Sequence, residues 1–184
     1  MRVAYLAQLF ELANEPGSDR QFFNCKQLVN AGHEVTVITS NVEYKTATAK
    51  YENQGLRPII KTVDEIAIWY VYAYRHFRGS FKKRFWYYLT YFFAALWAST
   101  DLKHPDAVYA VSTPLTVGFL GYCLSRLKRV PFVFEVTDIW PDAAVATGVV
   151  SNQALIRAAQ WLEMFCYINL IVLEFPFSVS PNSY

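Results

Sequence analysis

The sequence predicts an α/β domain with a Rossmann-like parallel sheet and helices on both faces. Within the first 40 residues, a strand-like, a helix-like and a second strand-like segment follow one another. Two short, nearly continuous apolar runs come later, as is typical of strands buried in parallel sheets. The hydrophobic fraction of 54% in 184 residues supports the core of one such domain, and the length is too short for two of that size.

The first unit spans residues 2–40. Residues 2–9 predict a strand, and turn-forming residues follow it. Ser18 and Gln21 have the spacing of a capping box, so a helix is predicted over 20–30, ending before Gly32. Residues 33–40 predict a second strand. A strand, a helix and a strand in this order imply parallel pairing with a right-handed crossover.

The remaining elements continue the alternation after a polar loop. An edge strand is predicted over residues 56–63, and buried strands over 107–111 and 132–136. Helices are predicted over 115–127 and 155–170, and a last short strand over 171–173.

Residues 66–100 are basic and aromatic and contain no acidic residue. The uncharged run 85–100 has 16 residues, about 24 Å as a helix, which is marginal for a hydrocarbon core of about 30 Å. Three interpretations remain open: an interfacial membrane helix, a core helix beside a solvated basic loop, and a surface for single-stranded nucleic acid. The membrane helix is favoured, and the nucleic-acid surface is disfavoured because no RNA-binding motif accompanies this stretch. The expected membrane contacts are Arg75, Arg78, Lys82, Lys83, Arg84 and Trp86.

Several classes of protein are disfavoured. The three cysteines form no C-x-x-C or Cys/His cluster, so we expect neither a disulfide framework nor a metal site. A net charge of +2 is too weak to indicate a nucleic-acid binder. The nucleophile motif G-x-S-x-G is absent, and because the first residues lack the apolar length and cleavage site of a signal peptide, we do not expect one there. We therefore expect a cytoplasmic protein with reduced thiols.

Polar residues directly follow the buried strand 132–136. Asp138, Trp140 and Asp142 come where ligands bind in open α/β sheets, outside the carboxyl ends of the strands. The alternative is an Asp that only caps the next helix. Earlier in the chain, the loop around Gly17 precedes a helix and is a candidate for backbone contacts with a phosphate or sugar; an ordinary turn is the alternative there.

The segment Val130–Gly148, with Phe-Glu-Val-Thr-Asp-Ile-Trp-Pro-Asp at its centre, resembles family 4 glycosyltransferases of the GT-B fold. It is most similar to the branch that builds O-antigen and capsule, including fucosaminyltransferase-like enzymes. Supporting similarities occur at Ser112-Thr113-Pro114-Leu115, Ala31–Thr39 and Ser80–Arg84.

The resemblance implies that residues 1–173 are the acceptor domain of a retaining two-domain enzyme, followed by a divergent tail over 174–184. The C-terminal donor domain is absent from these 184 residues. No cofactor is therefore expected, and the nucleotide-sugar donor is expected only with that domain. The implied reaction moves a sugar to a lipid-linked saccharide, with this chain inactive alone.

The resemblance also implies roles for single residues. Asp138 would orient or deprotonate the acceptor hydroxyl, and Trp140 would stack on a sugar. The other expected substrate contacts are Gly17, Arg20, Ser112, Thr113 and Asp142. Expected partners are the lipid-linked acceptor, the anionic inner face of the cell membrane and a separate donor-domain chain, with no nucleic acid. The alternative function is a non-enzymatic membrane-surface or partner-binding module.

Overall fold

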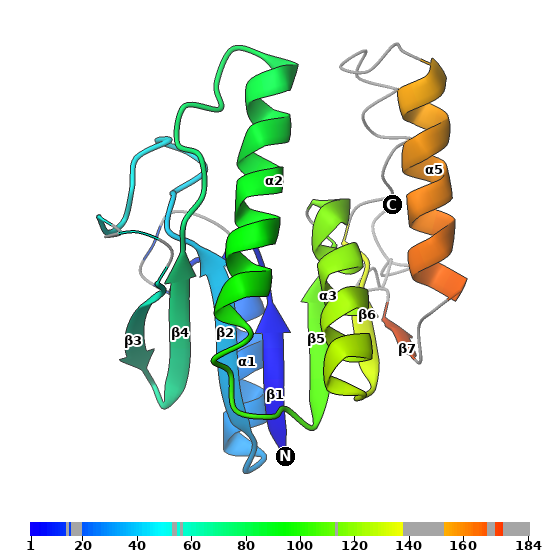
Figure 1. The fold of residues 1–184 in the computed structure, drawn as a ribbon. Coiled ribbons are helices and arrows are strands. Elements are labelled where there is room, and N and C mark those ends of the chain that lie inside the picture. The colour runs from blue at the N-terminus through cyan, green and yellow to red at the C-terminus, as the bar shows by residue number, and fades with distance from the viewer. Residues whose placement is uncertain are drawn as a thin grey trace, which may run out of the picture.

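The structure is a computed structural model that describes residues 1–13, 15, 20–52, 55, 57–112, 114–137, 153–168 and 172–174. Strands and helices alternate through most of this part of the chain (Figure 1). The elements are β1 (Arg2–Leu6), α1 (Arg20–Asn30), β2 (Glu34–Ser40), β3 (Ile59–Val63), β4 (Ile66–Val71), α2 (Phe81–Ala98), β5 (Ala107–Val111), α3 (Leu115–Lys128), β6 (Phe132–Glu135), α5 (Gln153–Ile168) and β7 (Val172–Glu174).

In the described residues, seven strands form one sheet in the order β3-β4-β2-β1-β5-β6-β7. All neighbouring pairs are parallel except β3 with β4, which is antiparallel. The predicted parallel sheet is confirmed, and β3 is the edge strand expected over 56–63. Because the other strands run in one direction, their carboxyl ends meet along one edge of the sheet.

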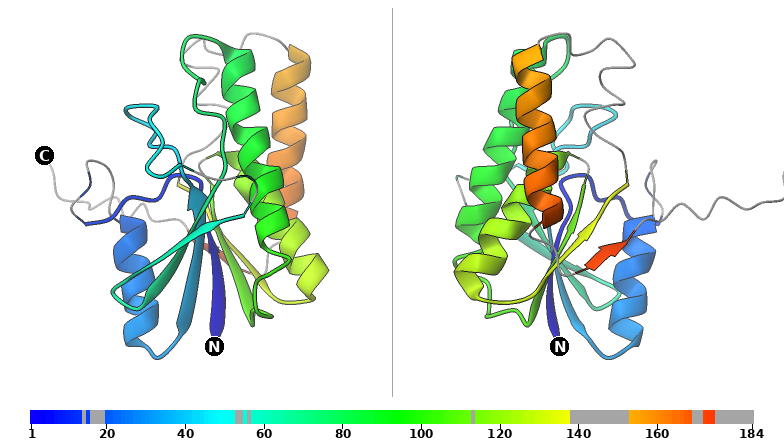
Figure 2. Two further views of the ribbon diagram at one scale, coloured as in Figure 1. Left: turned by 60° about the vertical axis from the view of Figure 1, so that its left-hand side comes forward. Right: turned by 90° about the vertical axis from the view of Figure 1, so that its right-hand side faces the viewer.

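Helices cover both faces of the sheet, as predicted. Helix α1 lies on one face, and α2, α3 and α5 lie on the other (Figure 2). The buried apolar residues form two clusters accordingly: one around Phe22 and Cys25 of α1, and a larger one that includes Tyr91 of α2 and Leu120 of α3. A fold with three layers therefore holds the carboxyl edge of the sheet in place.

Local signals in the sequence explain where α1 ends. Gly32 has a positive φ of 82°, its N–H donates to the Val29 carbonyl, and the His33 N–H donates to the Leu28 carbonyl. These are the two hydrogen bonds of a Schellman motif, which favours glycine. The expected end of the helix before Gly32 is confirmed.

Helix α3 packs very closely on the sheet. A Cβ on Gly121 would collide with the Phe132 ring and would lie 2.9 Å from the Ala110 Cβ. Glycine at this position therefore sets how near α3 comes to β5 and β6, and thus the position of the strand ends beyond them.

The basic-aromatic stretch divides between sheet, core and surface. Its first part is β4, where Tyr70 is buried; the expectation had placed no strand there. In α2, Tyr87 and Tyr91 are buried, and the Tyr91 hydroxyl donates to the Ile38 carbonyl (2.8 Å). The core interpretation is thus correct for one face of α2.

The other face of α2 is exposed. Trp86, Phe93 and Trp97 are 55%, 59% and 59% exposed. Among the described helices, none is both long enough and apolar enough to span a membrane.

Candidate active site

A buried carboxylate marks the carboxyl edge of the sheet. Glu135, the last residue of β6, is only 3% exposed at its side chain and lies 2.6 Å from the Arg20 guanidinium. Its second carboxylate oxygen accepts a hydrogen bond from the Tyr109 hydroxyl (2.9 Å). Arg20 is the first residue of α1 and Tyr109 belongs to β5, so the carboxylate joins three elements at this edge.

This arrangement follows from the cost of burying charge. An ionised carboxylate is stable in the interior only when it is paired and hydrogen-bonded. Arg20 supplies the positive counter-charge, and the Tyr109 hydroxyl supplies a hydrogen-bond donor. The Tyr109 ring is itself stacked on the Tyr5 ring, with 4.8 Å between the ring centres. Burial raises the pKa of the Tyr5 hydroxyl and of the Cys25 thiol, and the negative charge of Glu135 raises both further. Both groups are therefore neutral at physiological pH.

The backbone beyond β5 and β6 is tied together at the same edge. The Ser112 N–H donates to the Glu135 carbonyl (2.9 Å). The Thr137 N–H donates to Ser112 Oγ (2.8 Å), and the two hydroxyl oxygens lie 3.2 Å apart. These contacts fix the chain immediately before Asp138.

A second, partly buried ionic cluster fixes the segment that leads toward α1. Lys50 Nζ contacts Glu15 (2.6 Å) and Glu11 (3.0 Å) and donates to the Phe10 carbonyl (3.3 Å). Burial alone lowers the pKa of Lys50, but its hydrogen bonds to Glu15 and Glu11 outweigh burial and raise the pKa. The charged lysine thereby holds the segment after β1 against the loop after β2.

The family follows from comparison with known domains. The sequence model of one protein family, described as the glycosyl transferase 4-like domain, matches residues 24–170, which is most of the chain. The chain belongs to the glycosyl transferase 4-like family. No curated protein matches it significantly.

Two of the predicted substrate residues of this glycosyl transferase 4-like domain lie together. Arg20 contacts the Glu135 side chain and Ser112 contacts the Glu135 backbone. The other expected residues lie outside the described residues: Gly17, Thr113, Asp138, Trp140 and Asp142.

Sequence reasoning missed Glu135 and the Lys50 cluster. One signal was present for Glu135, a charged residue within an otherwise apolar run, Phe132–Val136. Such a residue must find a partner when the strand is buried. For Lys50 the polar loop around it offered no comparable signal.

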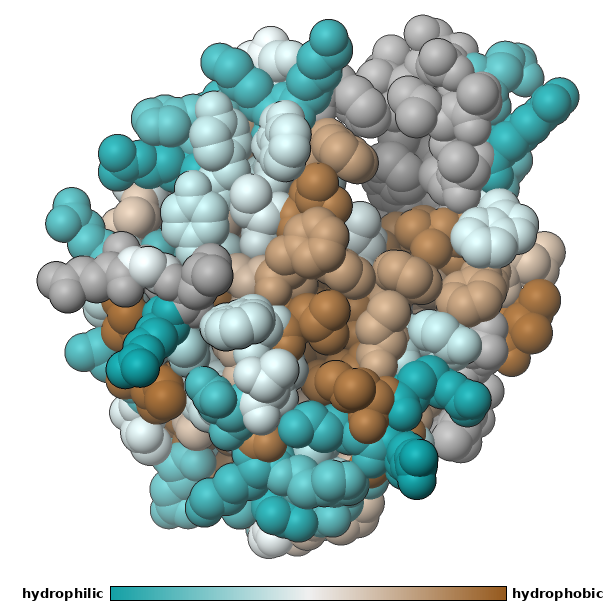
Figure 3. Space-filling model, viewed as in Figure 1, coloured by the Kyte–Doolittle hydropathy of each residue, from teal (hydrophilic) through white to brown (hydrophobic). Residues whose placement is uncertain are grey.

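The expected membrane contacts lie on the surface around the start of α2. Arg75, Arg78, Lys82, Lys83 and Arg84 are all exposed. Beside them, a groove of about 600 Å³ runs along α2, lined by side chains that include Trp86, Leu89, Phe93 and Trp97. Hydrophobic side chains gather over α2 and α3 in Figure 3, and hydrophilic ones lie at the upper end of α2. We call these exposed cations, together with the apolar groove beside them, the α2 surface.

Within the described ranges, no group of three or more His, Cys, Asp or Glu side chains is placed to hold a metal ion.

Proposed function

We propose that this domain is the acceptor-binding half of a retaining glycosyltransferase of the O-antigen and capsule type. The complete two-domain enzyme moves a sugar from a nucleotide donor to a lipid-linked saccharide. The observation that carries the proposal is the Arg20–Glu135–Ser112 constellation at the carboxyl edge of a glycosyl transferase 4-like domain. Open α/β sheets bind their ligands at this edge.

In the proposed reaction, the acceptor hydroxyl oxygen bonds to the anomeric carbon of the donor sugar, whose bond to the nucleotide diphosphate breaks. Asp138 follows Thr137 and accepts or directs the proton of that hydroxyl. Trp140 stacks on a sugar ring, and Thr113 and Asp142 hold its hydroxyls. The buried Glu135 is a positioning residue, because it keeps the Arg20 guanidinium in one place.

Arg20 is suited to an anionic ligand. Its side chain is 36% exposed, so N–H groups not facing Glu135 remain accessible from solvent. It also begins α1, where the helix dipole favours negative charge. We assign Arg20, together with the backbone at Gly17, to the donor phosphates, which arrive with a donor domain in the same or a separate chain.

The α2 surface supports the proposed lipid-linked acceptor. Exposed cations attract anionic headgroups, and exposed tryptophans settle at the membrane boundary. We therefore place the domain peripherally on the cytoplasmic face of the cell membrane. The same surface favours a second candidate function, a non-enzymatic membrane-surface or partner-binding module.

The two candidates are separated by a transfer assay in membranes of the source cells. Membranes from cells with the gene are expected to incorporate label from nucleotide sugars into lipid-extractable saccharide, and membranes lacking it are not. The Asp138→Asn variant should fail to restore incorporation, whereas Asp101→Asn should restore it. Asp101 is exposed and follows α2, at the opposite edge. Equal incorporation with and without the gene would favour the non-enzymatic module.

A further inference from the structure

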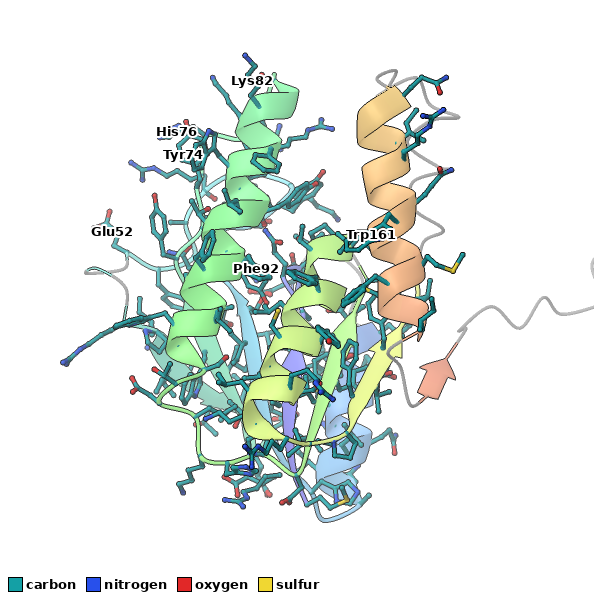
Figure 4. The ribbon with its side chains drawn as sticks, turned by 45° about the vertical axis from the view of Figure 1, so that its right-hand side comes forward. Glu52, Tyr74, His76, Lys82, Phe92 and Trp161 are labelled. Atoms are coloured by element: carbon teal, nitrogen blue, oxygen red, sulfur yellow. The ribbon has the colours of Figure 1, made fainter. Side chains whose placement is uncertain are left out.

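A polar cleft of about 450 Å³ opens at the carboxyl ends of β2 and β4. The loops that follow these two strands form its walls, and we call it the β2–β4 cleft. Tyr74 and His76 lie together beside α2, and Glu52 lies on the neighbouring loop (Figure 4). Other lining residues are Asn41, Tyr51 and Arg75. Its volume is within the range of small-molecule sites.

The cleft is preformed by hydrogen bonds beneath it. The buried Asn41 side chain donates to the Tyr51 carbonyl (3.1 Å) and accepts from the Ala73 N–H (3.3 Å), so it joins both walls. The Tyr74 N–H donates to Thr90 Oγ1 (2.9 Å), which fixes the second wall on α2. A ligand therefore meets ordered walls and loses little free energy in arranging them.

The lining suits the hydroxyls and ring faces of a sugar. Glu52 offers only acceptors, Arg75 only donors, and the Tyr74 hydroxyl both. The Tyr74 ring is half-buried and meets His76 edge-on, at 5.8 Å between ring centres. A sugar hydroxyl both donates and accepts, so it matches a mixture of such groups.

Charge disfavours an anionic ligand here. The carboxylate of Glu52 offsets the guanidinium of Arg75, whose Nε contacts His76 Nε2 at 3.3 Å. By contrast, Lys82, Lys83 and Arg84 on the first turn of α2 have no acidic neighbour in that segment of the sequence. A phosphate would therefore bind better at the first turn of α2, and an uncharged ligand would bind better in the cleft.

The position of the cleft relates it to the carboxyl edge described above. In the sheet order, β2 and β4 are separated from β6 by β1 and β5. With neighbouring strands about 4.8 Å apart, the cleft lies roughly 17 Å from the end of β6. One sugar ring cannot reach across that distance, whereas several linked rings can.

We propose that the β2–β4 cleft is a distal subsite that binds an uncharged sugar unit of the acceptor, several rings from the hydroxyl that reacts. The choice of a saccharide rests on the transferase function proposed above, and the location rests on the cleft itself. The acceptor is then an oligosaccharide rather than a single sugar.

The test is binding of the full chain to an array of neutral di- to pentasaccharides, with affinities then measured in solution. We expect the chain to bind at least one of them, with inorganic phosphate and pyrophosphate failing to compete. Glu52→Gln and Tyr74→Ala should each weaken binding by about tenfold, which is the upper end of the range expected for the loss of one hydrogen bond. Tyr74→Phe, which keeps the ring, should lose less.

The matched control is Glu65→Gln, an exposed glutamate at the turn before β4, at the other end of the strand; it should bind like the unchanged chain. Circular dichroism establishes that each variant is folded. Failure to bind any saccharide, competition by phosphate, or binding that ignores Glu52 and Tyr74 would each overturn the subsite. The membrane transfer assay does not depend on these results, so the transferase function stands or falls separately.

Discussion

The Arg20 guanidinium lies 2.6 Å from the Glu135 carboxylate, although more than one hundred residues separate the two in the sequence. Arg20 is 36% exposed and Glu135 is 3% exposed. The pair joins the first turn of α1 to the end of β6, and it does so beside the segment that leads to Asp138.

Removing Arg20 should destabilise the fold. In Arg20→Met, Glu135 remains buried without its counter-charge, and the loss for a fully enclosed pair is about 3–5 kcal/mol. Because Arg20 is partly exposed and water can replace it in part, we expect about 2 kcal/mol. Urea unfolding followed by circular dichroism measures the change.

Lys26→Met is the control for that experiment. Lys26 is also on α1 and pairs with Asp64 at 2.7 Å, but both side chains are more than 40% exposed. Such pairs contribute about 0–1 kcal/mol. Equal losses in the two variants would mean that the buried position of Glu135 adds nothing.

The Lys50 cluster should give stability a dependence on acid pH. Burial alone raises the pKa of Glu15, but hydrogen bonds from Lys50 and the Leu12 N–H outweigh it and lower the pKa. The stability due to ionised Glu15 is therefore present above its unfolded pKa and is lost as the pH falls through the lower, folded pKa.

This dependence is measured by comparing Glu11→Gln with the double variant Glu11→Gln/Glu15→Gln, since burial shifts the pKa of Glu11 the opposite way. We expect the single variant to be the more stable near pH 7 and the difference to shrink toward acid pH. A difference that is constant over this range would show that Glu15 does not titrate with a lowered pKa.

The α2 surface should bind anionic vesicles. Each cation near such a surface contributes about 1 kcal/mol, so replacing Lys82, Lys83 and Arg84 by Ser should weaken binding by up to roughly 3 kcal/mol. Added salt should weaken it as well, because exposed charges are screened. Vesicle flotation measures both effects.

A control of equal charge is Lys61, Lys103 and Arg126 replaced by Ser; all three are exposed, and Lys61 is on the edge strand β3, Lys103 before β5 and Arg126 in the last turn of α3. It should retain binding. Binding that ignores both salt and the Lys82, Lys83 and Arg84 substitutions would contradict a peripheral electrostatic mode, and carbonate extraction would then show whether the protein is inserted.

The purified chain of 184 residues should transfer no sugar from any nucleotide donor on its own. Transfer needs donor and acceptor held together, and orientation supplies much of the rate. A screen with radiolabelled nucleotide sugars checks this. Turnover would place a donor site within these residues.

The sequence by itself determined the strand and helix pattern of this domain. Alternation of apolar and turn-forming residues is a local property, so α1, its end at Gly32 and the buried strands β5 and β6 could be predicted. Parallel pairing followed from the strand-helix-strand order. The strand β4 was missed because its aromatic residues continue directly into those of α2.

Only the tertiary structure decided which side chains meet. The partner of Glu135 is more than one hundred residues away, and nothing in the local pattern around Arg20 selects it. Likewise, aromatic residues occur all around α2, so their pattern alone cannot tell the buried face of Tyr87 and Tyr91 from the exposed face of Trp86 and Trp97. Packing against the sheet makes that choice, because a helix buries only the face that meets another layer.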